Sequence, residues 1–192
     1  MNTIINPVMN EIEIKKSKFS TLLFPIHSIS EINEKLKQVK DDYPLATHYC
    51  YAYILLQNKK CSDDGEPLKT AGQPILNVLE KHQLSHILAI VIRYFGGIKL
   101  GAGGLVRAYS KAVVEAINIS TIKPLQLKTH IILSFSYEIE QTIHKLCPNL
   151  EIICKQYLEN ITYEGYATID ELETLKSHSK IKLQQLENSY RI

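Results

Sequence analysis

Hydrophobic and polar residues follow two different periods along this chain, and the changes of period predict where strands and helices lie. Alternation by two, or a short run of apolar residues, is typical of strands and occurs at 9–14, 19–26, 48–56 and 86–95. Spacing by three and four is typical of amphipathic helices and occurs at 28–44, 73–82 and 103–119. Ser28 and Glu31 have the spacing of a capping box at the first of these helices. This part of the chain is therefore predicted to form a mixed α/β layer.

The remainder of the chain predicts a second domain. Its elements are a strand at 130–136, a helix at 137–146, strands at 151–158 and 161–169, a helix at 170–177 and a strand at 180–187. Asp170 is predicted to cap the second helix. The order βαββαβ is that of the ferredoxin-like fold, which hosts many functions. The segment Ser120–Lys128 follows a long helix and contains Pro124, so we predict an α+β protein with domains at 1–123 and 124–192.

Composition excludes several classes of protein. The 192 residues are 45% hydrophobic and 22% charged, with 22 Lys+Arg and 20 Asp+Glu, which is typical of a globular protein and excludes disorder, collagen and coiled coils. The longest apolar run, Ile87 to Ile92, is six residues, whereas a membrane span needs ~20. Met1 to Lys16 has no apolar stretch of the secretory kind. Four cysteines without a repeated spacing suit a reducing compartment, so a cytoplasmic protein is expected.

Charge is unevenly distributed. Residues 1–123 hold 15 Lys+Arg and 11 Asp+Glu, a net +4, while residues 124–192 hold 7 and 9, a net −2. A polyanion is therefore expected to bind the first part of the chain rather than the second.

A glycine-rich segment, Gly96–Gly104, lies between a predicted buried strand and a predicted helix start. Backbone N–H groups at a helix start and the helix dipole attract anions, and glycine allows close approach. The segment matches neither the P-loop nor the dinucleotide fingerprint. Glycines required for positive φ or for tight helix–sheet packing remain the alternative explanation. The residues predicted for an anion or nucleic-acid site are Arg93, Gly96, Gly97, Lys99, Gly101, Gly103, Gly104, Arg107 and Lys111.

Two further patterns carry candidate chemistry. Asp63, Asp64 and Glu66 lie within four residues, either as ligands for a hard cation or as a turn whose acids orient neighbouring basic groups. Tyr49, Tyr51 and Tyr53 alternate along one predicted strand, where they either stack on bases or pack under a helix. Histidines and cysteines show no zinc spacing and no nucleophile motif. No catalytic residue, metal site or cofactor is predicted.

Five segments together resemble the bacterial YigZ branch of the IMPACT family. They span about residues 16–119 and occur in the family's order: Lys16–Phe19, Ala46–Tyr53, Ser62–Pro67, Thr70–Leu79 and Arg93–Tyr109. The resemblance implies a first domain like the second domain of ribosomal protein S-five and a ferredoxin-like second domain like the last domain of elongation factor G. It also implies a link to translation, because eukaryotic IMPACT is a translational regulator.

Three functional hypotheses follow. The first is a non-enzymatic RNA- or ribosome-binding protein that modulates translation, with phosphates on the glycine-rich segment and tyrosines stacking on unpaired bases. The second is a nucleotide-binding enzyme of the small-molecule kinase type, which would use the same segment for ATP phosphates and Asp63, Asp64 or Glu66 for Mg²⁺ or as a base. The third is a protein-interaction module. The RNA target and the oligomeric state do not follow from the sequence.

Overall fold

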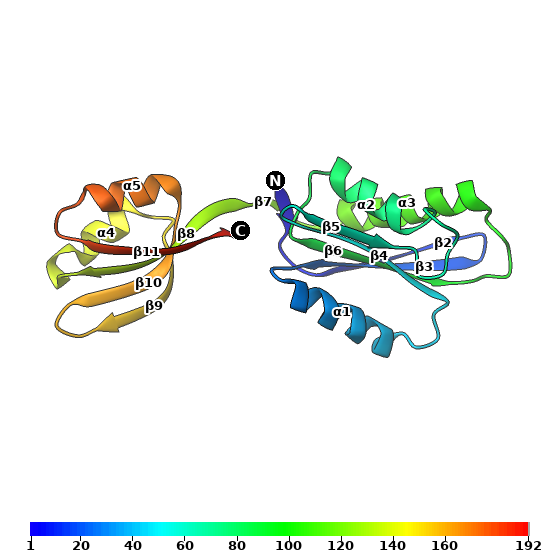
Figure 1. The fold of residues 1–192 in the computed structure, drawn as a ribbon, viewed down its shortest axis with the longest axis horizontal. Coiled ribbons are helices and arrows are strands. Elements are labelled where there is room, and N and C mark those ends of the chain that lie inside the picture. Colours follow the sequence, from blue (N-terminus) through cyan, green and yellow to red (C-terminus); the bar gives the residue numbers. More distant parts are fainter. Residues whose placement is uncertain (192) are drawn as a thin grey trace. The chain divides into compact units, whose positions relative to one another are not determined.

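The computed structural model describes residues 1–191 and divides the chain into two compact units. The first unit is Met1–Pro124 and the second starts at Leu125. Each unit combines helices with antiparallel strands (Figure 1). Among the described residues, no helix is both long enough and apolar enough to cross a bilayer.

The first unit is built on a five-stranded sheet with the order β2-β3-β6-β4-β5. Every neighbouring pair of its strands is antiparallel. In that spatial order the strands are β2 (Val8–Ile14), β3 (Ser17–Pro25), β6 (Ile87–Tyr94), β4 (His48–Leu55) and β5 (Asn58–Ser62). β6 is the central strand of this sheet, and the glycine-rich segment follows directly after its last residues.

Helices cover both faces of this sheet. The helices α2 (Gly72–Lys81) and α3 (Ala102–Asn118) pack on one face, and α1 (Ile29–Asp42) packs on the other (Figure 1). Along β6, Ala89 and Val91 belong to the core beneath α2 and α3, whereas the alternate residues Leu88 and Ile90 belong to the core beneath α1. The apolar run in β6 therefore reflects a strand buried on both faces.

The start of α1 follows the prediction in part. Ser28 is its N-cap, and the Ser28 hydroxyl accepts a hydrogen bond from the Glu31 N–H at 3.2 Å. The Glu31 carboxylate accepts from the N–H of His27 at 2.9 Å, and not from the N–H of Ser28 as the predicted capping box requires. A two-stranded pairing of β1 (Asn2–Ile4) with β7 (Ile122–Pro124) has no sequence signal, because three-residue strands are too short to show a period.

The second unit has the element order strand, helix, strand, strand, helix, strand. Its strands form one sheet with the order β11-β8-β10-β9. The elements are β8 (Gln126–Phe135), a 3₁₀ turn at Tyr137–Ile139 leading into α4 (Glu140–Leu146), β9 (Glu151–Tyr157), β10 (Ile161–Ala167), α5 (Ile169–Ser177) and β11 (Lys182–Arg191). Side chains from β8, β10, α4 and α5 form a separate core that includes Leu133, Ile143, Tyr163 and Leu175.

The start of α5 differs from the prediction, which was wrong about the capping residue. Thr168 is the N-cap, and Asp170 lies in the first turn. The Thr168 hydroxyl accepts from the Glu171 N–H at 3.3 Å, and the Glu171 carboxylate accepts from the Thr168 N–H at 3.0 Å. This reciprocal pair satisfies two backbone donors, whereas a single Asp cap would satisfy one.

Candidate functional site

The first unit contains a cavity of about 270 Å³ where β6 ends and α3 begins. It is lined by Glu66, Pro67, Arg93, Phe95, Lys99, Leu100, Gly101, Ala102 and Leu105. These residues come from the acidic segment after β5, the end of β6, the glycine-rich segment and the first turn of α3. The fold therefore brings together two segments that the sequence had marked separately.

Most glycines of the segment Gly96–Gly104 are explained by the fold. A Cβ at Gly96 would lie 1.9 Å from the carbonyl oxygen of Lys16, in the turn between β2 and β3. Gly97 and Gly101 have φ angles of +82° and +71°, which L side chains rarely adopt. A Cβ at Gly104 would lie 3.1 Å from that of Leu100. Backbone geometry and close packing thus account for four of the five.

Gly103 is the exception. It lies in the first turn of α3, its φ is not positive, and a Cβ there would have no atom within 4 Å. Glycine in a helix costs roughly 0.5–1 kcal/mol relative to alanine. Neither backbone conformation nor packing therefore requires glycine at position 103. The absence of a side chain there would, however, let an anion approach the backbone N–H groups at the helix end.

Gly103→Ala is accordingly expected to stabilise the first unit by about 0.5–1 kcal/mol while weakening binding of a phosphate-bearing ligand. Hydrogen exchange of the β6 amides measures the stability, and titration with RNA measures the binding. Unchanged RNA affinity in a stabilised variant would contradict a role for Gly103 in ligand approach.

The N-terminus of α3 has neither a side-chain cap nor an acidic residue in its first turn. Gly101 is the N-cap and has no side chain to accept from the helix. The first N–H groups of an α-helix have no partner within the helix and carry the positive end of its dipole. Lys99, which is exposed, lines the cavity beside them. The arrangement is therefore suited to bind an anion.

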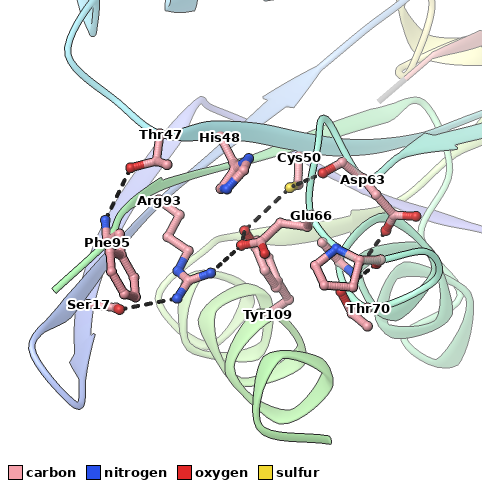
Figure 2. Close-up of polar contacts among 12 residues, drawn as sticks. Ser17, Thr47, His48, Cys50, Asp63, Glu66, Thr70, Arg93, Phe95 and Tyr109 are labelled. Carbon is pink, nitrogen blue, oxygen red and sulfur yellow. Dashed lines mark hydrogen bonds and ion pairs between the residues drawn. The ribbon is translucent and has the colours of Figure 1, made fainter. Parts of the chain in front are cut away.

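Arg93 is held at the cavity but is not a free surface cation (Figure 2). Its side chain is 6% exposed, and its Nη1 lies 2.5 Å from Oε1 of Glu66, itself 3% exposed. Nη2 donates to the Ser17 hydroxyl at 3.3 Å, while Nε has no partner among the described residues. The central guanidinium carbon lies over the rings of Phe19 and Phe95, 5.5 Å from each centroid. Glu66 therefore balances the charge that the sequence had assigned to ligand binding.

A chain of buried polar groups continues from this ion pair. Tyr109 of α3 donates to Oε1 of Glu66 at 2.8 Å, and the Cys50 sulfur lies 3.3 Å from the Tyr109 hydroxyl (Figure 2). Burial raises the pKa of the Cys50 thiol to about 12. Burial, followed by the neighbouring Cys50 and Glu66, also raises the pKa of Tyr109. Both groups therefore remain protonated at neutral pH and act as hydrogen-bond donors rather than nucleophiles.

The three acids of the 63–66 segment point to different partners. Asp63 accepts from the N–H groups that begin α2, with distances of 3.0 Å to Ala71 and 2.8 Å to Gly72. Asp64 accepts from the N–H of Tyr49 at 2.7 Å. Since Glu66 binds Arg93, all three carboxylates accept hydrogen bonds from neighbouring parts of the protein, and this agrees with a turn whose acids orient their neighbours. In the described part of the chain, no group of three His, Cys, Asp or Glu side chains is placed to hold a metal ion.

The tyrosine row lies away from the glycine-rich segment. Tyr49, Tyr51 and Tyr53 pack against the core beneath α1, whereas Arg93 and Glu66 lie on the α2–α3 side of the sheet. The aromatic residue beside the segment is Phe95, which is 49% exposed. In the sequence, Phe95 is the last residue of the strand predicted at 86–95, whereas β6 ends at Tyr94 and leaves Phe95 in the loop. The sequence does not show that the turn of Lys15 and Lys16 packs against Gly96, because 80 positions separate Lys16 from Gly96.

Comparisons with known proteins identify the family. The model of the Impact N-terminal domain matches residues 15–117, which include the whole site. YvyE of Bacillus subtilis, an IMPACT family member, is 39% identical over 170 residues, covering 86% of this chain and 77% of that protein. YigZ of Escherichia coli, also an IMPACT family member, is 38% identical over 170 residues, covering 85% of this chain and 80% of that one. A crystal structure of a hypothetical protein has a TM-score of 0.66 and 30% identity, with 97% of both chains covered. This chain, which is similar to YigZ over most of its length, therefore belongs to the IMPACT family.

Proposed function

We propose that this protein binds RNA or the ribosome and modulates translation, and that phosphates bind at the N-terminus of α3. The observation that carries the proposal is this helix end, which has no side-chain cap and no acidic residue in its first turn and which lies at a cavity beside Lys99. The resemblance of the two domains to parts of ribosomal protein S-five and elongation factor G supports the same function. A cytoplasmic location would follow from it.

Exposed cations support binding to a polyanion. Arg107 and Lys111 are exposed on α3, and Lys99 is exposed in the preceding loop. Residues 1–123 carry a net charge of +4. Cations that bind phosphates release counterions from nucleic acid, so the affinity should fall steeply as salt rises.

Lys99→Ala/Arg107→Ala is expected to lower the slope of log affinity against log salt by about two units, one for each phosphate that the variant no longer neutralises. Co-sedimentation with ribosomes and with free ribosomal RNA between ~50 and ~200 mM salt measures the slope. Lys37→Ala/Lys60→Ala is the matched control, because it also removes two exposed cations of the first unit. A folded Lys99/Arg107 variant with the wild-type slope would remove these residues from the site.

The carboxylates of the 63–66 segment favour this proposal over the kinase alternative. A kinase would need Asp63, Asp64 or Glu66 for Mg²⁺ or as a base. Each of the three instead accepts hydrogen bonds from the protein, from α2, from β4 and from Arg93 respectively. A shift in melting temperature at millimolar ATP that Gly103→Val abolishes would nevertheless favour the kinase.

A further inference from the structure

The cavity at the start of α3 also indicates what part of an RNA it binds. Resting on the RNA-binding function proposed above, we propose that the cavity takes one unpaired nucleotide, with its base stacked on the ring of Phe95 and its phosphate on the first N–H groups of α3. The base-binding residue is thus Phe95 rather than the tyrosines of β4.

Phe95 carries an exposed ring on an anchored stretch of backbone. The residue is 49% exposed, and its N–H donates to the Thr47 hydroxyl at 3.2 Å (Figure 2). The Thr47 N–H donates in turn to the Arg93 carbonyl at 2.8 Å. The Arg93 guanidinium lies over the ring, 5.5 Å from its centroid, and this cation–π contact restricts the ring. A ring ordered before binding loses little conformational entropy when a base stacks on it.

Arg93 gives a second, independent indication of a ligand. It lines the cavity, its side chain is 94% buried, since 6% is exposed, and its Nε has no partner among the described residues. A buried donor without an acceptor is unfavourable, so buried polar groups nearly always have partners. Glu66 and Ser17 leave this donor unpaired because they bind only Nη1 and Nη2. Nε is itself covered by protein atoms, so it marks the wall of the cavity as a place where a nearby acceptor would be favourable.

The size and lining of the cavity select one nucleotide. Its volume of about 270 Å³ lies just below the ~300–1,000 Å³ usual for pockets that hold drug-sized ligands, so there is room for a single base. Pro67, Leu100 and Leu105 supply apolar walls. Bases stacked within a duplex do not enter such a pocket, whereas unpaired bases do.

The backbone beside the cavity is open to a phosphate. No atom lies within 4 Å of the positions that a Cβ would take at Gly97, Gly101 and Gly103. A sugar–phosphate chain can therefore approach the peptide N–H groups closely, with Lys99 beside it. Base and phosphate subsites thus lie at one helix end.

The test compares Phe95 variants of the full chain in binding a fluorescent single-stranded RNA, about 12 nucleotides long, and its duplex at low salt. Phe95→Ala and Phe95→Leu should each weaken single-strand binding about 5- to 150-fold, the loss expected for one stacked base. Phe95→Trp should retain it. Ile98→Ala is the matched control, because Ile98 is 41% exposed on the same loop but does not line the cavity. Duplex binding and the salt slope should remain those of the wild type.

The outcomes separate this proposal from the proposed function. Wild-type single-strand affinity in both Phe95→Ala and Phe95→Leu, with a reduced salt slope in Lys99→Ala/Arg107→Ala, would overturn the nucleotide pocket and leave RNA binding intact. Equal weakening for single strand and duplex would also overturn the pocket. If the wild-type protein binds neither RNA nor ribosomes at the lowest salt, the proposed function fails and the pocket fails with it.

Discussion

Arg93→Ala is expected to destabilise the first unit by about 3–5 kcal/mol, the usual cost of removing one partner from a buried ion pair. Glu66, whose side chain is 3% exposed, would lose the guanidinium 2.5 Å away. Tyr109 would still donate to the same carboxylate oxygen, but one neutral donor does not replace a cation. Hydrogen exchange of the β6 amides in the full chain measures the change, because β6 is the central strand of the unit.

The double substitution Arg93→Met/Glu66→Gln distinguishes the ion pair from a loss of packing. Removing both charges leaves no unpaired ion, so the double variant should be considerably more stable than the sum of the single changes predicts. Additive destabilisation would show that the pair contributes only through its volume. The salt slope of RNA binding should not change in the double variant, because Arg93 and Glu66 together carry no net charge.

The parts of the fold that sequence predicted are those with a local period. The apolar run of β6 and the three-four spacing of α3 arise within one element, so each could be recognised without its neighbours. The N-cap of α1 at Ser28 is equally local. At α5 the sequence offers two possible N-caps, Thr168 and Asp170. Thr168 is the N-cap, because together with Glu171 it satisfies more backbone donors than Asp170 would.

The site could be predicted only in part, because its contacts join distant residues. Glu66 and Arg93 were both identified as chemically interesting, but 27 positions separate them, and only the sheet order brings them together. No local pattern shows that Glu66 neutralises Arg93. The side of the sheet on which the tyrosine row packs depends on where α1 lies, which periodicity along β4 does not determine.

Gly96→Ala is expected to destabilise the first unit by about 1–3 kcal/mol or more, because the added Cβ would overlap backbone atoms. It would lie 1.9 Å from the Lys16 carbonyl oxygen and 2.5 Å from the Ser17 nitrogen. These atoms belong to a tight turn in which Lys15 and Lys16 already have positive φ, so the turn has little freedom to move. Ser17 also holds Arg93, and any shift would therefore reach the ion pair.

Alanine variants at Gly96, Gly97 and Gly103 distinguish three effects on stability, namely steric overlap, a positive φ and helix propensity, by the sign and size of the change. Gly97→Ala meets no neighbouring atom but keeps a φ of +82°, which should cost about 1–2 kcal/mol. Gly103→Ala has neither problem and should be more stable than the wild type. We therefore expect Gly103→Ala to be the most stable variant and Gly96→Ala the least in hydrogen exchange of β3 and β6. A Gly96→Ala protein as stable as Gly97→Ala would show that the β2–β3 turn yields easily, and the contact between this turn and the glycine-rich segment would then not be what fixes Gly96.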